Sequence, residues 1–119
     1  MNIKKAIQNE IDEAIFNFTV GNNSQAKIQI SKILESHPKV ANAWHALAEI
    51  LLSEKEYKEA AEAANKAHDL EPEDLHINTT LSRIWVQMGD KKKAEYYNAK
   101  ARMMSWKEQL QEPQAKENQ

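Results

Sequence analysis

The sequence predicts an all-α fold, a right-handed solenoid of three helix-turn-helix units with an extended C-terminal helix. The first observation is composition: 119 residues contain only two glycines and three prolines, and residues that favour helices dominate. The second is that small residues and turn residues recur every 34 positions. The third is that apolar residues follow helical spacing in six polar-bounded segments.

The 34-residue period is visible in four series of positions. These series are Ala26, Ala60 and Ala94; Ala14, Ala48 and Ser82; Pro38 and Pro72; and Gly21 and Gly89 with Lys55 between them. Small side chains at fixed positions let paired helices approach closely. The prolines come after the second segment of a unit, where proline prevents the helix from continuing. Each unit is therefore expected to be two helices joined by a turn.

The middle unit carries a more specific pattern: Trp44, Leu47, Ala48, Leu51, Tyr57, Ala60, Ala64, Ala67 and Pro72. These residues and this period resemble the tetratricopeptide repeat family. The third unit keeps Leu81, Ser82, Trp85, Gly89, Asp90, Ala94 and Ala101, and the first keeps Ala14, Gly21, Ala26 and Pro38. The first unit departs from the family at Glu10, Glu13 and Asn17, where the family is apolar.

The repeats are expected at 7–40, 41–74 and 75–108, within a single domain over 1–111 followed by a disordered tail at 112–119. Helices are expected at about 3–19, 24–36, 41–53, 57–69, 75–87 and 91–111. The outward positions of the last helix (Glu95, Asn98 and Arg102) and the three polar departures in the first unit are expected to cap the array at both ends, making it a complete three-unit solenoid.

Composition excludes several classes of function. The chain has no cysteine, so it has no disulfide, no thiolate metal site and no cysteine nucleophile. Two glycines cannot form a glycine-rich phosphate loop, and no catalytic, cofactor-binding or metal-binding residues are predicted. A formal net charge of -2 does not indicate nucleic-acid binding. No segment resembles a signal peptide or a membrane span, so a soluble, cytoplasmic, non-enzymatic protein is expected.

By the resemblance, the first helices of the units line a concave groove that binds a protein or peptide partner. The expected groove residues are Ile11, Ile15, Phe18, Asn42, His45, Glu49, Leu52, His76, Thr79 and Arg83, with Gln8 and Val86 beside them. An apolar wall with a few polar groups suits an extended or helical peptide. The alternative interpretation is that Ile11, Ile15 and Phe18 are core residues, since apolar residues at helical spacing usually pack inward.

One subclass of the family binds the acidic carboxyl terminus of chaperones through Lys, Asn and Arg side chains. The matching positions here are Ile11, Ile15, Ala46, His76 and Thr80, and none has that chemistry. Arg83 is instead expected to form a solvated ion pair with Glu49. His45 and His76 should face the groove from adjacent helices, where two imidazoles line a peptide site more often than they bind a metal.

The last helix carries a second apolar stripe formed by Tyr96, Ala99, Met103, Trp106 and Leu110. A separate stripe, Ala94, Tyr97, Ala101 and Met104, should pack on its own unit. The first stripe predicts an interaction site, through which the chain could form a homodimer or accept a partner helix, unless the helix end folds back over it. The sequence therefore predicts an adaptor, scaffold or assembly chaperone, with a structural oligomerisation module as the alternative.

Overall fold

The computed structural model describes residues 2–111, and all regular structure in that range is helical. The helices are α1 (Ile3–Thr19), α2 (Asn23–Ser36), α3 (Ala41–Ser53), α4 (Tyr57–Leu70), α5 (Leu75–Gln87) and α6 (Lys91–Gln111). They match the expected segments to within one residue at each end. The tail expected at 112–119 lies outside the described residues. The single-domain assignment and the repeat boundaries remain predictions.

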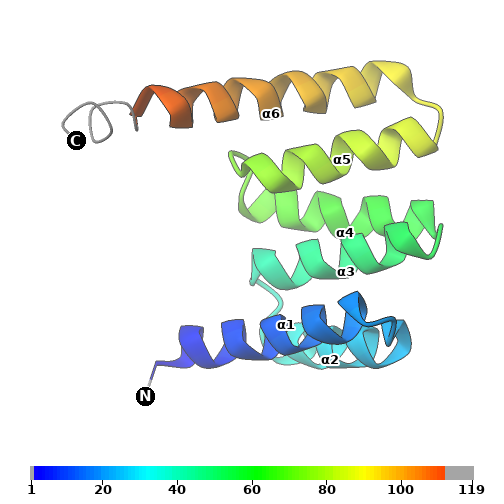
Figure 1. Ribbon diagram of the computed structural model, residues 1–119, viewed down its shortest axis with the longest axis vertical. Helices are drawn as coiled ribbons and strands as arrows, with labels where there is room; N and C mark the ends of the chain where they lie inside the picture. Colours follow the sequence, from blue (N-terminus) through cyan, green and yellow to red (C-terminus); the bar gives the residue numbers. More distant parts are fainter. Residues whose placement is uncertain (1, 112–119) are drawn as a thin grey trace.

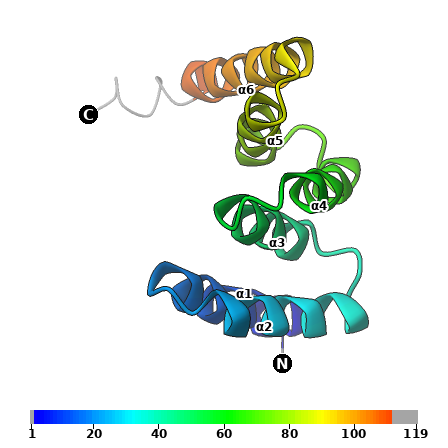
Figure 2. The ribbon, with the colours of Figure 1, turned by 90° about the vertical axis from the view of Figure 1, so that its right-hand side faces the viewer.

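The helices pack in sequential pairs, α1 with α2, α3 with α4 and α5 with α6 (Figure 1). The pairs are stacked through contacts of α2 with α3 and of α4 with α5. The first helices also contact one another, α1 with α3 and α3 with α5. Within residues 2–111 the backbones of the second helices lie farther apart, although the rings of His68 on α4 and Tyr97 on α6 pack edge to face at 5.7 Å. The first helices therefore form one continuous layer, and the second helices spread apart along the opposite side (Figure 2).

The three turns inside the pairs share one backbone conformation. Gly21, Lys55 and Gly89, spaced 34 residues apart, have φ values of 94°, 64° and 77°. This left-handed region costs an L-residue about 1–2 kcal/mol but costs glycine nothing. The sequence period is therefore also a period of the backbone, and Lys55 is the strained member of the series.

Two clusters of buried side chains form the core. One lies around α1, α2 and α3 and includes Ile11, Ile30 and Ile50; the other lies around α3, α4 and α5 and includes Ile77 and Leu81. The alanines of the 34-residue series, at positions 26, 60 and 94, are all buried. They lie where helices approach closely, which is the role that their small size predicts.

A side-chain bond to the backbone of the preceding loop recurs at the start of the second and third units. The indole Nε1 of Trp44 donates to the carbonyl of Pro38 at 2.7 Å. Thirty-four residues later, the amide of Asn78 donates to the carbonyls of Pro72 and Asp74 at 3.1 and 2.8 Å. Asn78 is fully buried, and its amide nitrogen is 3.7 Å from the sulfur of Met104. The amide of Asn78 is smaller than the indole of Trp44, and so leaves room for Met104 of α6 to pack beside it.

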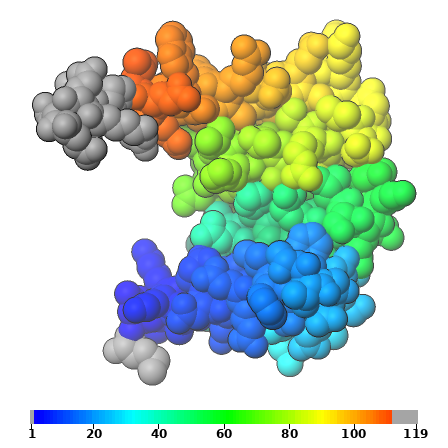
Figure 3. Space-filling model, in the orientation of Figure 1, coloured from blue at the N-terminus to red at the C-terminus, as the bar shows by residue number. Residues whose placement is uncertain are grey.

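The last helix is the longest, with 21 residues. Its C-terminal turns project beyond the helices below it (Figures 1 and 3). Ala94, Ala101 and Met104 are buried and Tyr97 is half-buried, so the predicted inner stripe packs on its own unit. None of the helices between residues 2 and 111 has the length and apolar character needed to span a lipid bilayer.

Candidate functional site: the concave groove

Three side-chain bonds join the first helices across the groove. Asn42 on α3 donates to Gln8 on α1 at 2.9 Å. On the other side of α3, His45 Nε2 is 2.8 Å from the Thr80 hydroxyl of α5. Farther along the same two helices, one guanidinium nitrogen of Arg83 lies 2.9 and 3.0 Å from the two carboxylate oxygens of Glu49. The central helix is therefore linked to both of its neighbours.

A hollow of about 280 Å³ lies between α1 and α3. Its wall is mainly apolar and includes Ile15 and Phe18, and its polar rim is formed by Gln8, Thr19, Asn42, His45 and Glu49. Ile15 is 40% exposed and Phe18 is half-buried. An apolar hollow with a small number of placed polar groups is the usual form of a ligand site.

A second hollow of about 550 Å³ adjoins the first, because Phe18 and Glu49 line both. It continues toward the α5 end of the groove and is lined in addition by Leu52, Ser53, Lys55, Tyr57, Arg83, Val86 and Gln87. Val86 is 60% exposed, so this end also offers apolar surface to a ligand. The two hollows together extend across all three first helices.

The predicted groove residues lie at different depths. Ile11 and Leu52 line the hollows but are only 1% and 8% exposed, because both belong to the core. Of the three residues with a core alternative, Ile11 is buried, while Ile15 and Phe18 remain accessible; Leu52, expected only in the groove, is buried as well. Asn42, His76, Thr79 and Arg83 are exposed, and His45 and Glu49 are half-buried. The Thr79 hydroxyl donates to the carbonyl of Leu75 in its own helix.

His45 is the groove residue with the most perturbed chemistry. Its burial lowers the pKa of the imidazole below the ordinary value of 6.5, and the charges of His76 and Arg83 act in the same direction. The carboxylates of Glu49 and Asp74 oppose this shift but are outweighed. Near neutral pH the ring is uncharged, so its Nε2 can either donate to or accept from the Thr80 hydroxyl.

The structure confirms the expected pair of Arg83 with Glu49. The two side chains are 56% and 33% exposed, so water screens their attraction. His45 on α3 and His76 on α5 lie near enough for the charge of His76 to contribute to the lowered pKa of His45. Within residues 2–111, no group of three or more His, Asp or Glu side chains is arranged to hold a metal ion.

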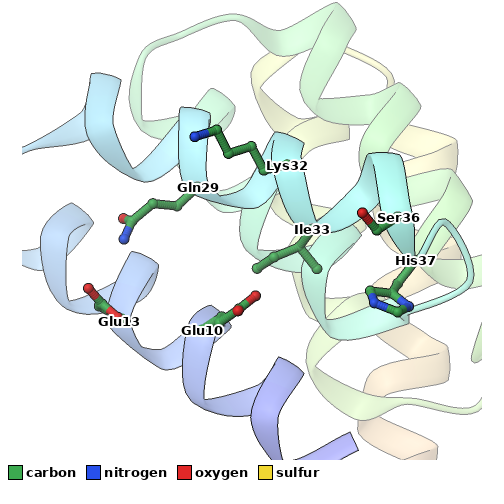
Figure 4. Close-up of a pocket in the computed structure, with 7 residues that line it drawn as sticks. All are labelled: Glu10, Glu13, Gln29, Lys32, Ile33, Ser36 and His37. Carbon is green, nitrogen blue, oxygen red and sulfur yellow. The ribbon is translucent and has the colours of Figure 1, made fainter. Parts of the chain in front are cut away.

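A separate hollow of about 470 Å³ opens on the outer side of the first unit, where Glu10 and Glu13 on α1 face Gln29, Lys32 and Ile33 on α2 (Figure 4). Thirty-four residues later, Trp44 and Leu47 are half-buried between α3 and α4. The hollow exists because the two carboxylates remain in water where the next unit packs apolar side chains.

Glu10 and Glu13, two of the three residues expected to cap the first unit, are exposed, and so is the apolar Phe16, which that expectation did not include. Phe16 is 64% exposed, although Ile50 and Ile84, at 34-residue intervals after it, are 1% and 0% exposed. Asn17 is half-buried and donates to Gln29 of α2 at 2.7 Å. At the other end, Glu95, Asn98 and Arg102 are exposed, as expected. Whether the array is complete remains a prediction.

The outer stripe of α6 is accessible along its whole length. Tyr96, Met103, Trp106 and Leu110 are 58%, 45%, 65% and 64% exposed, and Ala99 is exposed between them. The helix does not fold back over these residues within the described range. The outer stripe is therefore a second candidate surface, separate from the groove.

The family model that matches the chain is described as a tetratricopeptide repeat and covers residues 51–103. No curated protein sequence matches at a significant level. Solved structures do match: the second TPR domain of Spaghetti (RPAP3), bound to an HSP90 peptide, aligns with 84% of this chain and 98% of its own, at a TM-score of 0.77 and 17% identity.

Two bacterial structures match as well. The Yersinia enterocolitica type III secretion translocator chaperone SycD, in an alternative dimer, gives a TM-score of 0.78 at 11% identity over 84% of this chain and 76% of its own. PilF from Pseudomonas aeruginosa gives 0.78 at 26% identity over 82% of this chain, which spans only 44% of PilF. These likenesses show that the three stacked helix pairs have the tetratricopeptide fold.

Proposed function

Because the chain belongs to the tetratricopeptide repeat family, whose members generally mediate protein–protein interaction, we propose that it is a non-enzymatic adaptor, scaffold or assembly chaperone that captures a partner peptide in the concave groove. The observation that carries the proposal is the pair of adjoining hollows that share Phe18 and Glu49. They provide a concave surface across three helices that are linked side by side.

The chemistry of the hollows favours an amphipathic peptide. An apolar side chain of the ligand would enter the smaller hollow against Ile15 and Phe18, which together give it most of its accessible apolar wall. The amides of Asn42 and Gln8 lie at its rim and can bond to the ligand backbone. The Glu49–Arg83 pair has no net charge, so it can bond to polar groups of a ligand but selects neither an acidic nor a basic ligand.

The HSP90 peptide bound by the Spaghetti domain is not proposed as a ligand here. The positions that would have to hold its carboxylates are Ile11, Ile15, Ala46, His76 and Thr80. Ile11, Ala46 and Thr80 are also buried, so they present no polar group to the groove. A peptide that binds this groove must therefore be recognised by features other than carboxylates at these five positions.

The test uses two substitutions on neighbouring residues of α1. Peptides selected from a displayed random library on the wild-type protein are measured against Ile15→Asp and Phe16→Asp. Ile15→Asp places a charge in the smaller hollow and should weaken binding at least about tenfold, which corresponds to about 1.4 kcal/mol. Phe16→Asp is the matched control, because Phe16 is exposed outside both hollows, and it should leave the affinity unchanged.

Equal affinities for wild type and Ile15→Asp, with both variants fully helical, would refute groove binding. The alternative function, a structural module that self-associates through α6, would then be favoured. That alternative is supported by the exposed outer stripe. It predicts a sedimenting mass above that of the monomer, which substitutions in the groove would not change.

A further inference from the structure

The outer stripe of α6 has the spacing of a helix-pairing surface. Its residues, Tyr96, Ala99, Met103, Trp106 and Leu110, follow one another at steps of three, four, three and four. This is the spacing with which two helices interlock side chains. The stripe spans fifteen residues, or about 21 Å of helix. Its large side chains are about half exposed or more, so α6 presents two apolar faces of which only one is packed.

Three lysines run along one flank of the outer stripe. Lys93, Lys100 and Lys107 are spaced seven residues apart, and so lie on one line along the helix. The ammonium group of Lys100 is 5.8 Å from the ring centre of Tyr96, which places this line beside the stripe. The ammonium group of Lys93 lies over the Trp85 ring of α5 at 4.2 Å, so the flank faces α5.

The charge of α6 differs in sign from that of the preceding chain. Helix α6 has five lysines and one arginine against two glutamates, a formal net charge of +4. Residues 1–90 have fourteen acidic and nine basic residues, a net charge of -5. The positive charge of the molecule is therefore concentrated on the helix that has the free apolar stripe.

This charge disfavours a second copy of α6 as the occupant. In an antiparallel pair, the two lysine lines would face each other. In a parallel pair, each line would face the other flank, formed by Glu95, Arg102 and Gln109, which has no net charge. The single carboxylate there, Glu95, is already 4.0 Å from Lys91. A homodimer would bury the stripe without compensating the lysines.

We propose that the outer stripe of α6 binds an amphipathic helix of a partner protein whose apolar face is flanked by acidic side chains. The apolar residues of the partner would interlock with Met103, Trp106 and their neighbours. Its carboxylates would lie against Lys100 and Lys107. This surface is separate from the groove, so the chain could bind two partners. An experiment that excludes binding at one of the two surfaces would therefore not exclude binding at the other.

The probe is a synthetic 21-residue helical peptide with leucine at heptad positions a and d, glutamate at e and g and alanine elsewhere. A matched peptide has lysine in place of every glutamate. Fluorescence anisotropy with the full chain should show that the glutamate peptide binds at least about tenfold more tightly, and that this preference shrinks as salt is raised. The double substitution Lys100→Glu with Lys107→Glu should reverse the preference.

A neutral double substitution tests the apolar part of the site. Met103→Gln with Trp106→Gln should weaken the glutamate peptide at least about tenfold while helicity by circular dichroism is unchanged. Ile15→Asp, in the groove, should have no effect. Lys107→Glu alone serves as a second charge variant, because Lys107 is exposed and its substitution does not disturb packing.

Two results would overturn the proposal. One is equal affinity for the glutamate and lysine peptides. The other is a wild-type dimer in sedimentation that Met103→Gln with Trp106→Gln converts to a monomer, because a second copy would then occupy the stripe.

Discussion

The groove and the outer stripe of α6 are two surfaces of one molecule with opposite organisation. In the groove, polar side chains from adjacent helices bond to one another, and apolar residues such as Ile11 and Leu52 are mostly buried. On α6, large apolar side chains face outward, and lysines line one flank. A groove ligand that bonds to these polar side chains must exchange existing hydrogen bonds for its own, in addition to covering Ile15 and Phe18, whereas a ligand of the stripe gains mainly from apolar burial.

The largest expected effect separates the two faces of α6 at adjacent residues. Met104 is 4% exposed and packs on α5, whereas Met103 is 45% exposed in the outer stripe. Met104→Lys should lower the free energy of unfolding by about 3 kcal/mol, because it buries a charge with no partner. Met103→Lys should change it by less than about 0.5 kcal/mol. Urea unfolding followed by circular dichroism measures both, and equal losses would mean that the stripe is packed.

The next effect compares a buried amide beneath α6 with an exposed one in the groove. Asn78→Ala leaves the carbonyl of Pro72 without its side-chain donor, removes one of the two hydrogen bonds to the carbonyl of Asp74 and opens space beside Met104, and should cost about 2 kcal/mol. Asn42→Ala removes only the exposed bond to Gln8 and should cost less than about 0.5 kcal/mol. The same unfolding assay applies. Similar costs would show that the groove bonds contribute as much as the core bonds.

A smaller effect, of opposite sign, is expected at the turn beside the larger hollow. Lys55→Gly relieves a residue held at a φ of 64° and should raise the free energy of unfolding by about 1 kcal/mol. Glu62→Gly, on the exposed face of α4, should lower it by about 1 kcal/mol. Thermal unfolding of both variants checks the prediction. It fails if Lys55→Gly destabilises the protein as Glu62→Gly does.

The smallest effect is a dependence of stability on pH. Burial lowers the pKa of His45 and of His68 below 6.5, so the folded protein binds fewer protons than the unfolded chain in mildly acidic solution. The free energy of unfolding should therefore fall as the pH drops below about 6.5 and be fully retained above it. His45→Gln should reduce this slope without removing it, because His68 remains. A stability that does not change between pH 7.5 and pH 5.5 would contradict the assignment.

The sequence predicted the fold because its signals are periodic. Alanines at 34-residue intervals, the prolines at 38 and 72 and the turn residues at 21, 55 and 89 each repeat the same structural role, so the errors in helix bounds are at most one residue. The predicted inner stripe of α6 and the Glu49–Arg83 pair are also confirmed. Both follow from helical spacing within a known repeat.

The depth of individual side chains could not be predicted in the same way. Ile11 and Ile15 are one helical turn apart, yet they are 1% and 40% exposed, because depth depends on how α1 is rotated against α3. The bond of His45 to Thr80 depends on the same rotation between α3 and α5. The exposure of Phe16 follows from its place in the repeat. Its counterparts 34 and 68 residues later, Ile50 and Ile84, are buried where their helices pack on the preceding helix pair, and α1 is the first helix of the described chain.

The contacts among first helices have a mechanical consequence. Side-chain hydrogen bonds tie α3 to both α1 and α5, whereas in the described chain α4 and α6 meet through the rings of His68 and Tyr97. Under tension between the two ends, widening of the groove requires rupture of individual hydrogen bonds, whereas spreading of α6 from α4 requires separation of these two rings. Three short side-chain bonds therefore resist widening of the groove together with the packing of the first helices, and a single substitution removes any one of these bonds.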